Sequence, residues 1–266
     1  MIVFNTESYI NLDMKIVINA KYHDLAEFIN SLPAIFEKQG EVLNDARNVI
    51  KRFQVGDLKI VVKRYKLPNI FQRIIYSTIR PTKAQRAYDY GLLFNQLGVD
   101  TPEPIAYILT YRTLFRYGYF LSLNTDDESV LDLIKKSGKS DTERFENSRK
   151  LLIELAVFLA DLHKKGIFHG DLNLSNVLCR IQNNKYHFSL IDTNRTHFHK
   201  NPSNDICIDN LTRLTQPDLI YEYIVKNYAK TRNLDEQKTI KQASENLSNF
   251  RKKRNKKAKI KRCLKI

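Results

Sequence analysis

The polar segment His169–Asn176 restricts the folds open to this chain more than any other feature. Residues 143–165 precede it and carry apolar side chains at the spacing of one broad helix face. Two short strand-like runs, 177–181 and 186–191, follow it, and the second ends at Asp192. The sequence therefore predicts a polar loop held between a long helix and a small hairpin.

Three polar residues in and after this loop have the spacing of a phosphoryl-transfer site. The loop matches H-x-D-x-x-x-x-N at each fixed position. Phosphoryl transfer needs a base near the acceptor hydroxyl, metal ions against the phosphates and a cation on the phosphate tail. We predict that Asp171 is the base and that Asn176 and Asp192 hold magnesium. A polar turn with helix-capping residues is the structural alternative.

The first half of the chain has the pattern of a small β-rich unit. Strands predicted at 49–55 and 58–65 flank Gly56–Asp57, which is a short hairpin signal. The other predicted elements of this half are helices at 22–32 and 81–97 and strands at 105–111 and 115–123. We therefore predict an α+β, two-lobed fold like that of a protein kinase, with a β-rich N-lobe at 14–123 and a helical C-lobe at 124–250.

Lys63 is the candidate for the cation that binds the phosphates of ATP. It ends the second strand of the predicted hairpin, from where its side chain would point into the cleft, and Lys51 and Lys59 fit outward-facing positions better. A carboxylate on the following helix would fix the Lys63 rotamer, and Asp89 is the candidate. No G-x-G-x-x-G is present, and the loop before the hairpin contains Arg47. For Arg47, a phosphate contact and a surface salt bridge both stay open.

The net charge of +15 is concentrated at the C-terminus. Residues 251–266 contain ten Lys/Arg and no acidic residue, which leaves +5 for the rest of the chain. Such a basic tail favours an anionic membrane face or nucleic acid as partner, and a solvated, disordered end is the alternative. A second basic cluster, for which a substrate role and plain solubility both stay open, consists of Arg64, Lys66, Arg73, Arg80 and Lys83.

The termini and the cysteines exclude other classes of protein. No apolar stretch reaches the roughly 18 residues of a membrane span, and the N-terminus lacks the pattern of a signal peptide. We expect neither export nor a membrane-spanning helix. The three cysteines are scattered, which argues against a disulfide scaffold and fits a reducing cytosol. Residues 1–13 are expected to form a disordered extension.

Several of these stretches together resemble one known family. His169–Asn176 and Leu190–Arg195 are similar to the lipopolysaccharide kinase family, the Kdo and heptose kinases. Ala46–Phe53, Val61–Tyr65 and Gly98–Tyr107 are similar to the same family. The likeness covers roughly residues 14 to 215.

The resemblance implies a cytoplasmic enzyme with a protein-kinase-like fold. Such enzymes use ATP and Mg²⁺ to phosphorylate an inner-core sugar of lipid A-linked lipopolysaccharide, here Kdo in preference to heptose, at the inner face of the plasma membrane. It implies that Lys63 binds ATP, that Asp171 is the base and that Asn176 and Asp192 bind the metal. The basic tail would contact the anionic membrane surface, and nucleic acid is not expected as a partner.

The chain also departs from ordinary protein kinases. Asp192-Thr193-Asn194 stands where they have D-F-G, and no A-P-E follows. This argues against an activation loop and against a typical protein substrate. Two alternatives stay open: a small atypical protein kinase, and a kinase-shaped scaffold whose basic tail holds nucleic acid.

Overall fold

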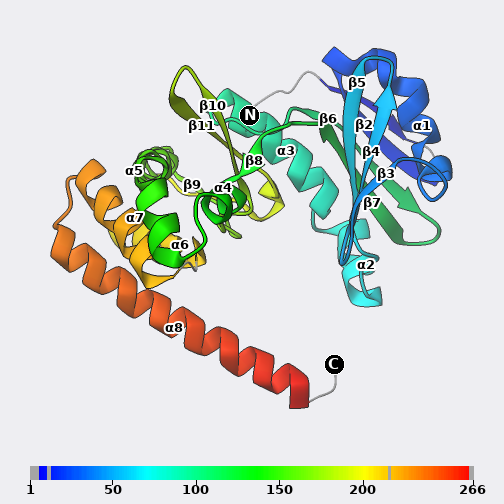
Figure 1. Cartoon of the computed structure of the whole chain (residues 1–266). Helices are drawn as coiled ribbons and strands as arrows, with labels where there is room; N and C mark the ends of the chain where they lie inside the picture. The colour runs from blue at the N-terminus through cyan, green and yellow to red at the C-terminus, as the bar shows by residue number, and fades with distance from the viewer. Residues whose placement is uncertain (1–5, 11–12, 215–216, 264–266) are drawn as a thin grey trace. The chain divides into compact units, whose positions relative to one another are not determined.

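The computed structural model describes residues 6–10, 13–214 and 217–263, and the chain forms two compact units (Figure 1). The first unit comprises Met1–Asp126 with Ile191–Asn194, and the second comprises Asp127–Leu190 with Arg195–Ile266. The short segment Ile191–Asn194 therefore returns to the first unit, although the sequence around it belongs to the second. The predicted boundary between residues 123 and 124 assigned this segment to the second lobe.

A seven-stranded antiparallel sheet forms the centre of the first unit. Its strands, in order across the sheet, are β1 (Thr6–Ile10), β2 (Met14–Asn19), β6 (Pro104–Tyr111), β7 (Phe115–Leu123), β5 (Leu58–Arg64), β4 (Val49–Val55) and β3 (Glu41–Asp45). β4 and β5 form the predicted hairpin, with Val55 opposite Leu58. Gly56 in their turn has a φ of 57°, a left-handed conformation that glycine adopts without strain.

Helices cover both faces of this sheet. The helices of this unit are η1 (Ala20–Leu25), α1 (Ala26–Ile35), α2 (Ile70–Thr78) and α3 (Lys83–Gln96), and α1 and α3 are the two that cover the faces. α1 buries Ile29 and Leu32 in one apolar cluster with Ile16 and Ile18 of β2. α3 buries Ala84 and Tyr88 in another cluster, with Val17 of β2. Because alternate residues of a strand point to opposite faces, α1 and α3 lie on opposite sides of the sheet.

Three parts of the first unit differ from the sequence prediction. Residues 6–10 form strand β1, paired with β2, so they are not part of a disordered extension. Strand β3 and helix α2 were not predicted at all. β3 could not be predicted from apolar alternation, because all of its side chains are exposed.

Lys51 on β4 is also placed differently from the prediction. It is buried, with 7% of its surface exposed, rather than facing outward. Its ammonium group donates to the backbone carbonyls of Phe36 (2.5 Å), Gln39 (3.0 Å) and Glu37 (3.3 Å). Because these carbonyls lie at and just after the C-terminal end of α1, Lys51 supplies donors that the helix end itself lacks.

The second unit is mainly helical. Its elements are β8 (Glu128–Ser129), α4 (Val130–Lys136), α5 (Asp141–Lys164), β9 (Ile167–Phe168), β10 (Val177–Gln182), β11 (Lys185–Leu190), β12 (His197–Phe198), α6 (Asn204–Leu211), η3 (Thr212–Leu214), α7 (Asp218–Thr231) and α8 (Glu236–Cys263), with η2 (Thr193–Arg195) at the junction of the two units. α5 begins with a capping box between Ser140 and Glu143 and packs along α7. β10 and β11 form the predicted hairpin, and their turn contains Asn183 and Asn184 at positive φ.

The described part of the basic C-terminal segment, residues 251–263, is helical rather than disordered. α8 packs against α7 and α6 through buried residues such as Ala243 and Leu247. From Lys252 to Ile260 every side chain is exposed, so the helix continues beyond its packed part (Figure 1). Among the described residues, no helix combines the length and the apolar character that crossing a bilayer requires.

Candidate active site

The loop His169–Asn176 lies in the second unit and is fixed by its own hydrogen bonds. Three amide groups converge on the carbonyl oxygen of Asp171: the backbone N–H of Asn173 at 2.8 Å, the side-chain Nδ2 of Asn173 at 3.3 Å and the side-chain Nδ2 of Asn176 at 2.9 Å. The backbone N–H of Asp171 donates to Nδ1 of His169 at 3.2 Å. Leu172 and Leu174 are buried and anchor the loop in the core. The predicted base and the predicted metal ligand Asn176 therefore belong to one rigid turn.

Arg195 contacts this loop in two ways. Its Nη1 lies 3.5 Å from Oδ2 of Asp171, and both side chains are about half exposed. Its carbonyl oxygen accepts the backbone N–H of Gly170 at 3.2 Å. A Cβ atom at Gly170 would lie only 2.4 Å from that oxygen, so the close approach requires glycine. Arg195 belongs to one of the stretches that carry the family resemblance, but its contact with the predicted base Asp171 was not predicted.

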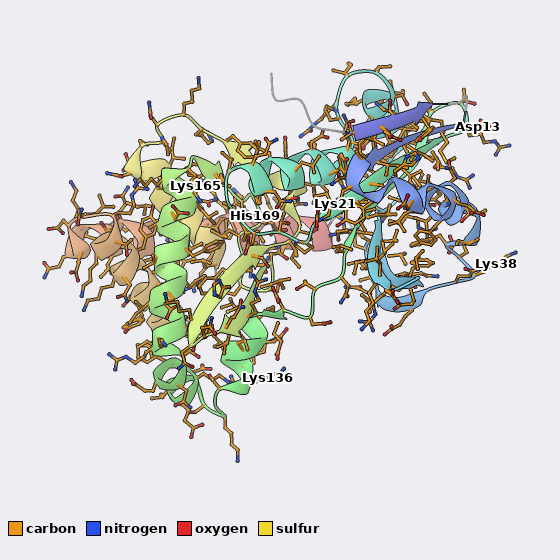
Figure 2. The ribbon with its side chains drawn as sticks, turned by 90° about the horizontal axis from the view of Figure 1, so that it is seen from above. Asp13, Lys21, Lys38, Lys136, Lys165 and His169 are labelled. Carbon is orange, nitrogen blue, oxygen red and sulfur yellow. The ribbon has the colours of Figure 1, made fainter. Side chains whose placement is uncertain are left out.

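A buried histidine supports the loop from helix α5. The His163 ring stacks on Phe168, the residue that precedes the loop, with ring centroids 4.9 Å apart. Its Nδ1 is hydrogen-bonded to the Tyr228 hydroxyl at 2.7 Å, and its Nε2 contacts Asn210 at 3.2 Å. Burial lowers the pKa of His163 to about 4, so the ring is neutral near pH 7. His169, which is labelled in Figure 2, directly follows Phe168 and begins the loop.

The donor chemistry of Asn176 fits a magnesium ion. Its amide nitrogen is used by the hydrogen bond to the Asp171 carbonyl, which leaves the amide oxygen as an acceptor. Magnesium prefers such hard oxygen ligands, and a carboxylate like that of Asp192 is of the same class. Among the described residues, no group of three or more His, Cys, Asp or Glu side chains lies close enough together to hold a metal.

Lys63 and Asp192 form an ion pair within the first unit. Lys63 lies on β5 with a side chain that is largely buried, and its ammonium group donates to Oδ1 of Asp192. The segment around Asp192 is held by Thr193, whose hydroxyl donates to the Ala87 carbonyl of α3 at 3.3 Å. Asp192 has a φ of 61°, which is uncommon outside glycine. Two of the predicted site residues, 129 positions apart in the sequence, are thus brought together.

Tyr65 lies beside this pair and was not predicted. The Lys63 ammonium lies 5.5 Å from the centre of its ring, within the range of a cation–π contact. The Tyr65 hydroxyl accepts a hydrogen bond from Asn194 at 3.5 Å. Burial raises the pKa of Tyr65, and the negative charge of Asp192 raises it further. The phenol therefore stays neutral beside the two charged groups.

The predicted pairing of Lys63 with Asp89 is wrong. Asp89 lies on α3, but Lys63 takes Asp192 as its partner. Burial raises the pKa of Asp89 to about 6, although hydrogen bonding to Gln85 and the charge of Lys15 act in the opposite direction. The prediction named an acid on α3, but the carboxylate that pairs with Lys63 comes from the distant segment after β11.

Arg86 on α3 is a second cation that was not predicted. Its charge lowers the pKa of Tyr65, in opposition to Asp192, so it lies within electrostatic range of that ring. Its Nε is buried, and the described residues give it no hydrogen-bond partner. The available sequence signal is that Arg86 lies on the same predicted helix as Asp89, three residues before it.

Arg47 stays a prediction. It lies between β3 and β4, in the turn of an edge hairpin, and it is exposed. This hairpin occupies the place in the chain where a phosphate-covering loop was expected.

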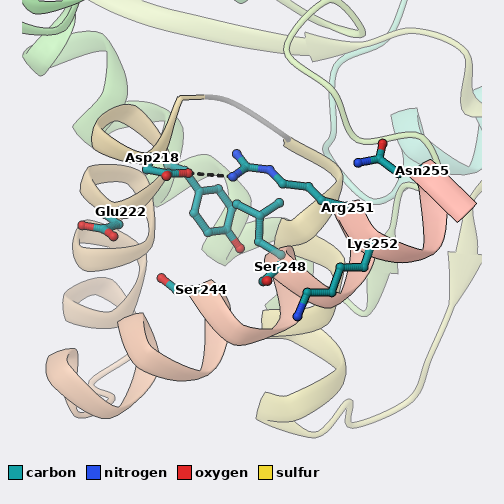
Figure 3. Close-up of a pocket in the computed structure, with 9 residues that line it drawn as sticks. Asp218, Glu222, Ser244, Ser248, Arg251, Lys252 and Asn255 are labelled. Carbon is teal, nitrogen blue, oxygen red and sulfur yellow. Dashed lines mark hydrogen bonds and ion pairs between the residues drawn. The ribbon is translucent and has the colours of Figure 1, made fainter.

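The second unit also contains a cavity of about 330 Å³, which no residue of the loop His169–Asn176 lines. α7 and α8 line it, and Arg251 of α8 bonds to Asp218 of α7 at 2.8 Å across it (Figure 3). Neither Asp171 nor Asn176 is among its lining residues. This cavity is therefore not the predicted catalytic site.

Comparison with known families identifies the chain. A sequence model of the lipopolysaccharide kinase (Kdo/WaaP) family matches residues 35–240, which is more than half of its length. The chain belongs to this family. The resemblance found in the sequence is therefore confirmed, and the matched region contains Lys63, Asp171, Asn176 and Asp192.

Individual relatives of this lipopolysaccharide kinase family member are distant. The 3-deoxy-D-manno-octulosonic acid kinase of Vibrio vulnificus (strain YJ016) is 24% identical over 157 residues, which cover 56% of this chain and 64% of that protein. The match thus spans less than two thirds of the relative's length. A solved structure of WaaP in complex with acyl carrier protein superposes with a TM-score of 0.58 at 12% identity, covering 91% of this chain and 98% of that one. This likeness confirms the predicted kinase-like α+β fold.

A further solved structure, of a microcompartment-associated aminopropanol kinase, is similar at a TM-score of 0.46 and 13% identity, covering 82% of this chain and 95% of that one.

Proposed function

We propose that this protein transfers the γ-phosphoryl group of ATP to a sugar of the lipopolysaccharide inner core, with Kdo favoured over heptose. The observation that carries the proposal is the rigid loop His169–Asn176, which presents a half-exposed Asp171 carboxylate beside Arg195. Membership of the family supports the class of reaction. Similarity to a 3-deoxy-D-manno-octulosonic acid kinase supports Kdo as the acceptor.

In the proposed reaction each polar residue has one task. Asp171 accepts the hydrogen bond of the acceptor hydroxyl and takes its proton as the oxygen attacks phosphorus. Arg195 holds the Asp171 carboxylate from one side. Lys63 supplies positive charge to the phosphates of ATP. Asn176 and Asp192 would hold Mg²⁺, which neutralises charge on the phosphates when it is bound.

The acceptor and its location form part of the same proposal. The sugar is attached to lipid A, and the reaction takes place at the cytoplasmic face of the inner membrane. The basic residues 251–266 support this location, because each basic side chain near an anionic leaflet contributes about 1 kcal/mol of attraction. The absence of D-F-G and A-P-E sequences disfavours the alternative of a protein kinase.

The test is phosphate transfer from ATP by the purified full-length chain to three acceptors. We expect transfer to lipid A that carries Kdo, less to a core extended with heptose, and none to a basic protein such as histone. Mass spectrometry of the product locates the phosphate on one sugar. Transfer to the basic protein alone would overturn the proposal in favour of a protein kinase.

Two substitutions separate the roles of the carboxylates. Asp171→Asn is expected to lower kcat by about 10²- to 10⁴-fold with little change in ATP affinity, because the base acts on the acceptor. Asp192→Asn is expected to weaken binding of the Mg²⁺–ATP complex as well as turnover. Asp161→Asn is the matched control, since Asp161 is also half exposed and paired, with Lys165. An Asp171→Asn variant that keeps more than about a tenth of the activity would show that Asp171 is not the base.

A further inference from the structure

Helix α2 exposes an apolar face of unusual size for a helix of nine residues. Phe71 is 75% exposed, and Ile79, which directly follows the helix, is 83% exposed. The full set of large apolar side chains exposed on and next to the helix is Leu67, Ile70, Phe71, Ile74, Ile75 and Ile79. No residue of α2 is buried. An exposed patch of this kind marks a site of interaction rather than ordinary surface.

The orientation of α2 is fixed by its polar side. Arg73 Nε donates to the Phe115 carbonyl at 2.8 Å, and the Ser77 hydroxyl accepts the Phe115 backbone N–H at 2.9 Å. The Tyr76 ring packs edge-on against Phe115, with centroids 5.7 Å apart. Polar contacts thus fasten α2 to β7, and the isoleucines point to solvent. This reverses the usual arrangement of a helix on a globular protein, where the apolar face is inward.

The charge around α2 is of one sign. Residues 58–88 contain eight Lys/Arg and neither Asp nor Glu. Lys66, before the helix, and Arg80, after it, are both exposed. A helix with an exposed apolar face and basic residues at its borders has the composition of an interfacial helix, which lies in the plane of a membrane surface.

We propose that α2 docks this protein on an anionic membrane surface, with Phe71 and the neighbouring isoleucines inserted among the lipids. The proposal deepens the proposed function, because it rests on an acceptor that is attached to a lipid. Charge complementarity selects the occupant: anionic lipid headgroups attract Lys66 and Arg80, whereas a second copy would bring two basic surfaces together.

A single tryptophan tests the insertion directly. The chain contains no Trp, so Phe71→Trp introduces one reporter into an otherwise Trp-free protein. We expect a blue shift of its emission, and quenching by brominated acyl chains, on addition of phosphatidylglycerol-containing vesicles. Ile153→Trp on α5, where Ile153 is 39% exposed, is the matched control and should show neither change. No ATP or acceptor is present, so failure here is distinguishable from failure of the proposed kinase activity.

Sedimentation with the same vesicles tests the apolar face as a whole. Ile74→Ser with Ile75→Ser is expected to lower the vesicle partition coefficient about tenfold or more. Ile153→Ser with Val157→Ser, a pair of exposed aliphatic residues on α5, should leave it unchanged. Two results would overturn the proposal. One is the absence of a vesicle-induced shift in the Phe71→Trp variant. The other is a blue shift of that variant without vesicles that grows with protein concentration, which would indicate a second copy as the partner.

Discussion

At the scale of single residues, Asp89 is a carboxylate whose charged form the fold disfavours. Burial raises its pKa to about 6, above the usual range for an aspartate in an unfolded chain. The native state therefore binds the proton more tightly than the unfolded state does. Burial of the charged carboxylate therefore lowers the free energy of unfolding. This loss is absent below about pH 4, grows as the pH rises and is complete above about pH 6.

Replacing Asp89 tests this effect. Asp89→Asn should stabilise the protein by about 1 kcal/mol at pH 7.5, a value that allows for solvent screening of a half-buried group, and by much less at pH 4.5. Urea unfolding at the two pH values measures the difference. Asp24→Asn, at an exposed aspartate, is the control. An equal gain at both pH values would mean that burial of the charge is not the cause.

Asp89 also shows how far single residues were predictable. The roles of Lys63 and Asp171 stay predictions; Lys63 was named from the end of its strand and Asp171 from the loop motif, because both signals are local. The acid that pairs with Lys63 was not predicted, because Asp192 lies 129 positions away and reaches Lys63 only after the segment returns to the first unit. A sequence pattern contains no direct record of such a contact.

At the scale of elements, most strands and helices before Asp192 that bury one face were predicted. The exposed β3 and α2 were not predicted, and neither were α6, α7 and α8, although these three helices bury apolar side chains. The hairpin of β4 and β5 follows the alternation of apolar side chains closely. β3 is wholly exposed, and α2 turns its apolar side outward, so neither has the pattern of a packed element. The same alternation also indicates that Lys51 faces inward, because it lies two residues from the buried Phe53 and so shares its face of β4.

Lys51 joins β4 to the end of α1, and removing its charge should loosen this junction. Lys51→Met keeps most of the apolar stem but leaves the carbonyls of Phe36, Glu37 and Gln39 without their donor. We expect a loss of about 2 kcal/mol, because hydrogen bonds made by a charged group contribute about 1.5–3 kcal/mol. Chemical denaturation gives the value. Lys59→Met, at an exposed position of β5, should change stability by less than about 0.5 kcal/mol; similar losses in both variants would refute the capping role.

At the scale of the whole molecule, the local patterns and the family resemblance predicted the same fold. The predicted catalytic loop and its flanking elements indicated a kinase-like fold, and the similarity to WaaP confirms this fold. Neither the loop nor the family resemblance, which ends near residue 215, predicted the structure of the C-terminal segment. Its high charge left a disordered end open as the alternative to a binding tail, but the packed half of α8, with Leu247 in the core, allows the helix to continue through Arg251 and beyond.

The distribution of charge leads to a prediction for the full-length protein. Deleting Lys252–Ile266 removes nine Lys/Arg and lowers the net charge from +15 to +6. Arg251 is kept because it bonds to Asp218 at 2.8 Å. No side chain from Lys252 to Ile260 is buried, so the shortened protein should unfold at the same denaturant concentration as the full chain. Circular dichroism during urea unfolding checks this.

The activity of the shortened protein should depend on how the acceptor is presented. We expect a large loss of rate on vesicle-bound acceptor and little loss on a short water-soluble sugar, because the tail concentrates the enzyme at an anionic surface without touching the chemistry. The loss should shrink between about 0.05 and 0.5 M salt, where the Debye length falls from roughly 14 to 4 Å. A full-length variant with glutamine in place of the nine basic residues separates charge from helix length and should behave like the deletion. Equal losses on both acceptors, or a loss that salt does not change, would assign the tail to substrate binding or structure instead.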